Sequence, residues 1–383
     1  MNFQHVSGAR CLVALTATLA LACGPAPTPT PVPAPAAVTS TTPSPPQPPV
    51  PPPPPVRKDG TIYAETEQMG TRVSINLWVG EGAPAQAGTA IEAAFAEIER
   101  LEQIMSEWRP SSELSQLNDN AGGPAKPLSP ELFEVLQRSK VIAEATDGAF
   151  DPTFHAVGQL WHFEPGARPP APEQIAAKLE LVGWRGIELD PNTGAGRLAR
   201  AGMKVGLGAI AKGYAVDRAS QVLVQHGFAN HVVEAGGDTY VSGSKAGAPW
   251  KVGIQRPDRP GSLAAIPATD IAIVTSGDYQ RFLDFDGKRY AHILDPRTGW
   301  PLDESASAQS VTLTAVNATD ADAYATAVAV MGPEKGMAFV EAHPGLGAVL
   351  LTRSGELRVS EDLRPILILP PAEPDKPPGP DVR

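Results

Sequence analysis

The sequence predicts an α+β fold, organised as one large domain of mixed hairpins and helices over residues 60–368 of the 383-residue chain. Three observations support this prediction: short segments of alternating polar and apolar residues, separate segments with apolar residues at helical spacing, and glycine-rich turns between them. Hairpins mixed with helices are typical of an α+β domain and not of a doubly wound parallel sheet. No linker-like segment interrupts these residues, whose number suits one large domain or two fused lobes.

The first predicted elements precede Gly202. Residues 72–79 alternate apolar and polar positions, which predicts a strand with one buried face. Residues 86–105 carry apolar side chains at helical spacing and predict an amphipathic helix. Ser129 followed by Pro130 is a favourable helix start, and the apolar residues after it again have helical spacing.

Short strands and glycine-rich turns follow Gly202. The predicted elements are a strand at 203–208, a helix at 214–227, two strands around a Gly-Gly-Asp turn at 231–243, a hairpin at 281–294, a strand at 310–316 and a helix from about 320 to 332. Asp286-Gly287 is expected at the tip of the hairpin, because both residues tolerate the backbone of a tight turn.

The N-terminus predicts export. Arg10 precedes an apolar run of signal-peptide length, and Ala22 lies directly before Cys23, as at a bacterial lipoprotein processing site. We therefore expect a signal peptide at 1–22 and a lipidated Cys23; the alternative is an ordinary signal peptide cleaved nearby. With Cys23 lipidated and Cys11 removed, the fold would rely on no disulfide.

Proline-rich segments flank the predicted domain. Residues 23–59 are expected to form a tether, since such a chain favours polyproline II and builds no core. Residues 369–383 are expected to be a disordered tail. The predicted location is the bacterial cell envelope, anchored by lipid to a membrane and facing the periplasm. A net charge of −11 without a lysine- or arginine-rich run argues against nucleic acid as a partner.

The segment "GLGAIAKGYAVD", residues 206–217, is a candidate phosphate site. Small residues lead into Lys212 and a helix, so that backbone N–H groups, the positive helix end and one ammonium would face an anion. A glycine turn with a solvent-exposed lysine is the alternative.

Asp322 and Thr326 are candidate metal ligands. They are four residues apart on a predicted helix and therefore share a face. A carboxylate and a hydroxyl are hard oxygen donors of the kind that Mg²⁺ takes together with phosphate oxygens. The alternative is that Asp320 or Asp322 only favours the helix N-terminus.

Three further residues have both a functional and a structural interpretation. Asp238 follows two glycines that allow a ligand to approach closely, or it belongs to a plain hairpin turn. Asp151 precedes Pro152 and is expected in an extended or turn conformation. His292 is either a packed histidine or a general base.

Eight motifs in succession closely resemble the ApbE family of FAD:protein FMN transferases, over about Met69 to Gly332. They are "MGTRVSI", "MSEWRPSSELSQLN", "GAFDPT", "GAIAKGYAVD", "GGD", "TSGDYQRF", "HILDPRTGWP" and "ADAYATA". The resemblance implies a T-fold-type domain in a lipoprotein that splits FAD with Mg²⁺. Such enzymes attach FMN through a phosphoester to a threonine or serine of an acceptor flavoprotein and release AMP.

The resemblance also assigns roles to residues. Asp322 and Thr326 match metal ligands, and Ala209 matches a position whose backbone carbonyl contacts the metal. Lys212 matches a lysine near the FAD phosphates, and His292 matches a proposed general base. The positions that match the flavin or adenosine pocket are Met69, Trp108, Ala149, Phe150, Asp151 and Asp238.

One departure from the family pattern concerns the glycine-rich segment. The family usually reads Asp-Leu-Gly-Gly-Ile-Ala-Lys-Gly where this chain has "GLGAIAKG", so that Gly206 replaces an aspartate and Ala209 a glycine. Three functions remain open: the protein-flavinylating transferase, an FAD pyrophosphatase that yields FMN and AMP, and a flavin-binding lipoprotein without catalysis.

Overall fold

The computed structural model describes residues 55–80, 84–164, 166–277, 282–303 and 307–371. The predicted signal peptide, Cys23, most of the predicted tether and residues 372–383 lie outside these ranges. Within the described ranges, no helix has both the length and the apolar character needed to span a membrane.

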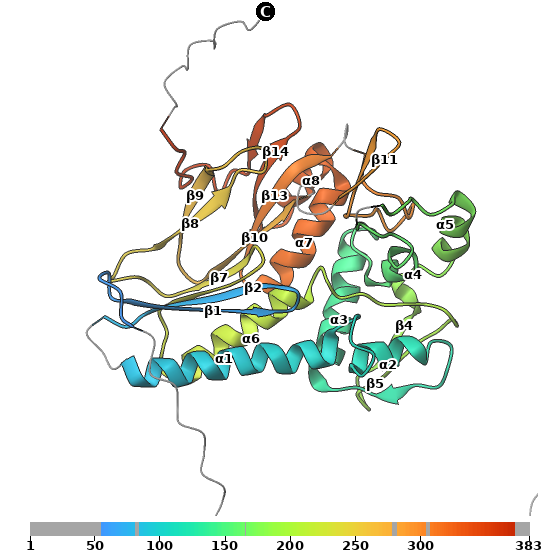
Figure 1. Cartoon of the computed structure of the whole chain (residues 1–383), viewed down its shortest axis with the longest axis horizontal. Coiled ribbons are helices and arrows are strands. Elements are labelled where there is room, and N and C mark those ends of the chain that lie inside the picture. Colours follow the sequence, from blue (N-terminus) through green and yellow to red (C-terminus); the bar gives the residue numbers. More distant parts are fainter. Residues whose placement is uncertain (1–54, 81–83, 165, 278–281, 304–306, 372–383) are drawn as a thin grey trace, which may run out of the picture. The chain divides into compact units, whose positions relative to one another are not determined.

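An antiparallel sheet of eight strands forms the centre of the fold, in the order β1-β2-β6-β7-β10-β13-β14-β15 (Figure 1). The strands are β1 (Thr61–Gln68), β2 (Thr71–Trp78), β6 (His231–Ala235), β7 (Asp238–Ser242), β10 (Ile271–Gly277), β13 (Ala308–Ala315), β14 (Gly347–Thr352) and β15 (Leu357–Val359). Smaller sheets join β3 (Lys126–Pro127), β5 (Ala195–Leu198) and β4 (Ile187–Asp190), then β8 (Trp250–Gln255) with β9 (Ser262–Ala268), and β11 (Phe282–Phe285) with β12 (Lys288–Ala291).

Helices pack against the large sheet and bury its main core. The long helices are α1 (Pro84–Met105), α3 (Pro130–Ala145), α6 (Ala211–Gln225) and α7 (Ala318–Met331), and the shorter ones are α2 (Glu113–Asp119), α4 (His155–Gly158), α5 (Pro172–Leu179) and α8 (Pro333–Glu341). Apolar side chains of α1, α6 and α7 share one buried cluster with alternate residues of the strands, such as Ala348 and Leu350. The intervening Val349 and Leu351 belong to a second cluster with the β8–β9 hairpin, as the two-residue period of a strand requires.

The junction of α6 and α7 positions most of the charged groups described below. Asp217 of α6 accepts hydrogen bonds from the backbone N–H groups of Ala318 and Thr319, at 2.8 and 2.9 Å, and from the Thr319 hydroxyl. A Cβ atom at Gly213 would lie 2.1 Å from the Ala318 carbonyl oxygen. Glycine at this position therefore lets the first turns of the two helices touch.

Most predicted elements are confirmed, and so is the α+β fold class. The strand at β2, the helices α1 and α3, the β6–β7 and β11–β12 hairpins and the strand at β13 lie where the residue patterns indicate. Ser129 caps α3 by accepting from the Leu132 N–H. Two helices begin earlier than predicted, at Ala211 and Ala318, and Asn317 caps the second of them. The first strand, β1, was not predicted from the sequence.

The predicted strand at 203–208 is wrong. Met203, Val205 and Leu207 are buried as the alternation indicates, but these residues pair with no strand in the part of the chain that the structure describes. Their backbone hydrogen bonds go to other partners. The Asn118 side chain accepts from the Val205 N–H at 2.7 Å and donates to the Val205 carbonyl at 2.8 Å.

Candidate active site

Three charged side chains from three different elements meet around the Lys212 ammonium; Lys212, Asp238 and Asp322 are called the Lys212 cluster below. The Lys212 Nζ atom lies 3.1 Å from Asp238 Oδ2 and 3.1 Å from Asp322 Oδ2. It also donates to the Gly208 carbonyl at 3.0 Å. Lys212 belongs to the first turn of α6, Asp322 to α7 and Asp238 to the start of β7. The structure thus brings together three residues that the sequence singled out separately.

The turn before β7 brings Asp238 to this position. Gly236 and Gly237 both have positive φ angles, 58° and 99°, as a tight hairpin turn requires. A Cβ atom at Gly236 would lie 2.5 Å from the Thr71 hydroxyl oxygen. Glycine therefore allows this turn to approach the start of β2, next to the Met69 turn.

The Lys212 cluster carries two carboxyl groups for one ammonium, and both carboxyl groups are buried. Burial, followed by repulsion from Asp322, raises the pKa of Asp238 well above its ordinary value, although Lys212 opposes this shift. Burial also disfavours the charged form of Lys212, but the attraction of Asp238 and Asp322 outweighs it and raises the pKa of the ammonium. Asp238 Oδ2 is in ion-pair distance of Lys212, yet it is buried without a hydrogen bond of suitable geometry.

The donor atoms around Asp322 fit a hard divalent cation. Thr326 follows one turn later on α7 and is half-buried, and its hydroxyl has no hydrogen-bond partner among the residues that the structure describes. Ala209 lies in the turn directly after Gly208, whose carbonyl binds Lys212. Among the described residues, no group of three or more His, Cys, Asp or Glu side chains is arranged to hold a metal. Mg²⁺ commonly takes one or two protein carboxylates and completes its shell with phosphate oxygens and water.

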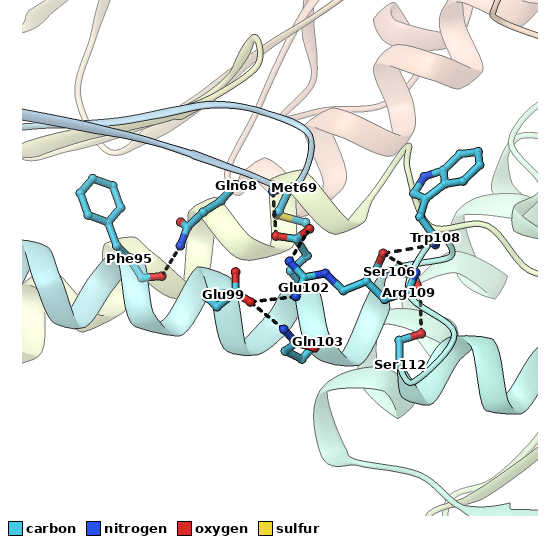
Figure 2. Close-up of polar contacts among 10 residues, drawn as sticks. All are labelled: Gln68, Met69, Phe95, Glu99, Glu102, Gln103, Ser106, Trp108, Arg109 and Ser112. Atoms are coloured by element: carbon cyan, nitrogen blue, oxygen red, sulfur yellow. Dashed lines mark hydrogen bonds and ion pairs between the residues drawn. The ribbon is translucent and has the colours of Figure 1, made fainter.

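Met69 and Trp108 are held by one network at the C-terminal end of α1 (Figure 2). Glu102 accepts from the Met69 N–H at 2.9 Å and forms an ion pair with Arg109 at 3.0 Å. Arg109 follows Trp108, and Ser106 accepts from the backbone N–H groups of both residues. Sequence reasoning missed Glu102, because a glutamate on an amphipathic helix carries no signal for this role.

Met69 and Trp108 show features that a simple structural role does not require. Met69 has a φ angle of 53° in the two-residue turn between β1 and β2, a conformation that is uncommon outside glycine. The Trp108 side chain is 78% exposed, and Figure 2 shows it projecting away from α1. An exposed aromatic ring held by a braced loop offers a stacking surface to a planar ligand.

Residues 149–151 lie deeper in the protein. Ala149 and Phe150 are buried in the main core. Asp151 has the predicted extended conformation, and its carboxylate accepts from the backbone and hydroxyl of Thr153 and from the Trp184 N–H. Burial raises the pKa of Asp151, although these hydrogen bonds oppose the shift. This carboxylate fastens its own loop, and contact with a ligand stays a prediction for these three residues.

His292 lies just after β12 and is half-buried. It precedes Ile293, whose carbonyl accepts from the Leu302 N–H at 3.1 Å, and a bridge joins Leu294 to Pro301. Within the described ranges, Lys212, Asp238 and Asp322 make no hydrogen bond or ion pair with His292. Its role as a general base stays a prediction.

Known proteins resemble both the sequence and the structure. The sequence model of the ApbE family matches residues 69–350. The chain is 34% identical over 293 residues to a FAD:protein FMN transferase of Treponema pallidum, in a match that covers 72% of this chain and 80% of that relative. It is likewise 34% identical over 252 residues to a FAD:protein FMN transferase of Vibrio cholerae, covering 64% of this chain and 74% of that relative.

Among solved structures, the ApbE protein of Thermotoga maritima superposes with a TM-score of 0.73 at 32% identity, covering 80% of this chain and 99% of that protein. The flavin transferase ApbE of Vibrio cholerae gives a TM-score of 0.70 at 31% identity, with the same coverage. The matched residues begin at Met69 and include every residue of the Lys212 cluster. This chain therefore belongs to the ApbE family of enzymes.

Proposed function

We propose that this chain transfers FMN from FAD to a threonine or serine of an acceptor flavoprotein, in a Mg²⁺-dependent reaction that releases AMP. The observation that carries the proposal is the Lys212 cluster, in which two buried carboxyl groups face one ammonium. Thr326 lies one turn after Asp322, and its hydroxyl has no hydrogen-bond partner among the described residues. Relatives named FAD:protein FMN transferase support the same reaction.

Phosphoryl transfer depends mainly on positioning and on charge neutralisation. In the proposed reaction, the acceptor hydroxyl oxygen forms a bond to the phosphorus of the FMN half, and the bond from that phosphorus to the bridging oxygen breaks. AMP leaves with the bonding electron pair. Lys212 would bind the phosphate oxygens, and Asp322, Thr326 and the Ala209 carbonyl would hold Mg²⁺, which would neutralise charge on the diphosphate.

Flavin binding is assigned to the surface near the end of α1. Trp108 would stack on a ring of FAD, and Met69 would contact the dinucleotide from the β1–β2 turn. Asp238 and residues 149–151 complete the proposed pocket. Cys23 is proposed as the lipid anchor that holds the domain in the cell envelope, facing the periplasm.

His292 is proposed to take the proton of the acceptor hydroxyl. Replacing this residue (His292→Ala) should leave FAD affinity unchanged and slow transfer about 10²- to 10⁴-fold, the usual contribution of a general base. FAD affinity is measured by flavin fluorescence and transfer by covalent label on the acceptor. His162→Ala, at an exposed histidine, is the control. A parallel loss of FAD binding and transfer in His292→Ala would return His292 to a structural role.

The function itself is tested with the domain from Arg57, FAD, Mg²⁺ and a flavoprotein fragment that carries an Asp-Gly-x-Ser/Thr-Gly/Ala-Thr motif. Covalent flavin is measured on the denatured fragment, and AMP in solution. Labelled fragment and AMP in equal amounts, both abolished by EDTA, are the expected result. AMP without label on any fragment would instead indicate an FAD pyrophosphatase, and neither product would indicate a flavin-binding protein.

A further inference from the structure

The glycine at position 206 is not required by the backbone. Its φ angle is not positive, so that an ordinary side chain is conformationally allowed. Space is the constraint: a Cβ atom at Gly206 would lie 2.7 Å from Glu107 Oε2 and 3.0 Å from the Cβ atom of His155. The Glu107 carboxylate therefore occupies the region into which a side chain at position 206 would extend.

Glu107 is held in this position by its loop and by the segment that it contacts. Its Oε2 atom accepts from the Leu207 N–H at 2.9 Å. The loop between α1 and α2 is braced by the Ser112 hydroxyl, which donates to the Ser106 carbonyl at 2.5 Å. The Gly206 N–H donates to the Pro152 carbonyl at 2.8 Å, so that three separate segments converge at the carboxylate.

The second oxygen of Glu107, Oε1, accepts no hydrogen bond from the residues that the structure describes. His155 Nδ1 is the nearest ionisable partner at 3.9 Å from Oε1, which is too long for a hydrogen bond. Burial lowers the pKa of His155 despite the opposing charge of Glu107, so that the imidazole is neutral near pH 7. No other described residue donates to Oε1, and the Glu107 side chain is only 12% exposed.

This oxygen faces the candidate active site. A Cβ atom at Gly208 would lie 3.9 Å from Oε1, and the Gly208 carbonyl binds Lys212. The neighbouring Trp108 ring is exposed and stands edge-on to His155 at 6.2 Å between ring centroids. A carboxylate oxygen that accepts no hydrogen bond from a described residue thus lies next to Gly208, which binds Lys212, and belongs to the residue directly before the exposed Trp108.

We propose that Glu107 is a substrate-binding residue, whose Oε1 atom accepts a hydrogen bond from a donor group of bound FAD. It supplies from the α1–α2 loop the carboxylate that the family usually carries at position 206. An ionised carboxylate only accepts hydrogen bonds, and the diphosphate offers no donor and repels it. The group that it binds is therefore a sugar or ribityl hydroxyl or a ring N–H. This inference rests on the proposed function.

The first test removes the charge alone. Glu107→Gln retains an acceptor for the Leu207 N–H, and it should raise the Kd for FAD about tenfold, because hydrogen bonds to a charged acceptor are stronger. Glu92→Gln, which removes the same charge from an exposed position on α1, should leave the Kd unchanged. Kd values of Glu107→Gln for FMN and for ADP then locate the donor group. If only the Kd for FMN rises, the donor lies in the flavin half of FAD; if only the Kd for ADP rises, it lies in the adenosine half.

The second test moves the carboxylate. Gly206→Asp alone should weaken FAD binding about tenfold or more, because it places a second carboxylate against Glu107. In Glu107→Ala/Gly206→Asp the steric and charge conflict with Glu107 is gone, and FAD affinity should recover to within about threefold of the unsubstituted protein. Glu107→Ala alone should stay weak. Thermal unfolding without FAD verifies that each variant is folded.

The outcomes separate this inference from the proposed function. An unsubstituted protein that does not bind FAD overturns the proposed function. Normal FAD binding with unchanged Kd in Glu107→Gln and Glu107→Ala overturns only the role of Glu107 and leaves it as a brace for Leu207. Failure of the folded double variant to bind better than Glu107→Ala contradicts the equivalence of the two carboxylate positions.

Discussion

Helix α6 meets α7 at two polar contacts that have opposite charge balance. At Asp217, one carboxylate receives hydrogen bonds from two backbone N–H groups and one hydroxyl at the start of α7. At Lys212, one turn and a half earlier, a single ammonium faces Asp322 of the same helix and Asp238 of β7. The first contact satisfies every group that it buries, whereas the second sets two buried carboxyl groups against one ammonium.

This difference separates a structural contact from a site that receives a ligand. Burial raises the pKa of Asp217 to about 6 in spite of its hydrogen bonds, so that ionising this carboxyl group near neutral pH offsets part of the stability that its hydrogen bonds supply. The Lys212 cluster buries an Asp238 oxygen that has no hydrogen-bond partner among the described residues. Because this oxygen lies on a carboxyl group whose pKa is raised by burial and by a second carboxyl group, the cluster is a candidate ligand site.

The largest expected effect on stability comes from removing the only ammonium of the Lys212 cluster. Lys212→Met should lower the free energy of unfolding by about 3 kcal/mol in EDTA, because it leaves two buried carboxyl groups without their cation. Urea unfolding at pH 7.5 measures this value. Lys204→Met breaks an ion pair with the exposed Asp119 and should cost less than about 1 kcal/mol. Equal losses in the two variants would show that the buried charges do not interact as described.

Asp217→Ala should lower the free energy of unfolding by about 2 kcal/mol, because the donors at the start of α7 lose their acceptor. The rate of flavin transfer per folded molecule should stay within about threefold of that of the unsubstituted protein, since Asp217 lies outside the proposed site. Urea unfolding and the transfer assay measure the two quantities. A transfer rate that falls a hundredfold in fully folded Asp217→Ala would mean that the two contacts are not separable.

A smaller effect concerns His231, which joins β6 to α6 through Ser220. Its Nε2 atom lies 2.7 Å from the Ser220 hydroxyl, and burial lowers the pKa of His231 to about 4. In the unfolded chain, His231 binds a proton near pH 6.5, whereas in the folded protein it stays neutral down to about pH 4. The contribution of neutral His231 to stability is therefore fully present above pH 6.5 and is lost as the pH falls toward 4.

Between pH 7.5 and 5.5, His231 should therefore remove about 1 kcal/mol of stability. In His231→Gln this part of the decline should disappear, as measured by urea unfolding at both pH values. His226→Gln, at an exposed histidine at the end of α6, serves as the control and should retain the decline. A decline of the same size in His231→Gln would assign the pH dependence to other groups.

The sequence predicts individual site residues better than their mutual contacts. Lys212, Asp238 and Asp322 each had a structural alternative, because local patterns cannot show that distant segments meet. The contact depends on Gly213 between α6 and α7 and on the Gly236-Gly237 turn, whose roles appear only in three dimensions. Glu107 carried no local signal in the sequence, since its proposed role depends on the contact of its carboxylate with Gly206, about a hundred residues further along the chain.

The wrong prediction at 203–208 has a related cause. Alternating burial indicates a strand only when a neighbouring strand supplies the hydrogen bonds. Here the side chains of Asn118 and Glu107 and the backbone carbonyl of Pro152 supply them, from α2, from the α1–α2 loop and from a short 3-10 helix. Partners of this kind leave no periodic trace in the sequence.

The most direct test of the proposed function is the initial rate of covalent flavin transfer at increasing Mg²⁺ concentration, for the unsubstituted protein and for Asp322→Asn. We predict a saturable dependence on Mg²⁺, no transfer in EDTA, and a loss of about 10³-fold in Asp322→Asn, since several kcal/mol of charge stabilisation depend on this carboxylate. Transfer that persists in EDTA, or an equal rate in folded Asp322→Asn, would contradict the role assigned to the Lys212 cluster.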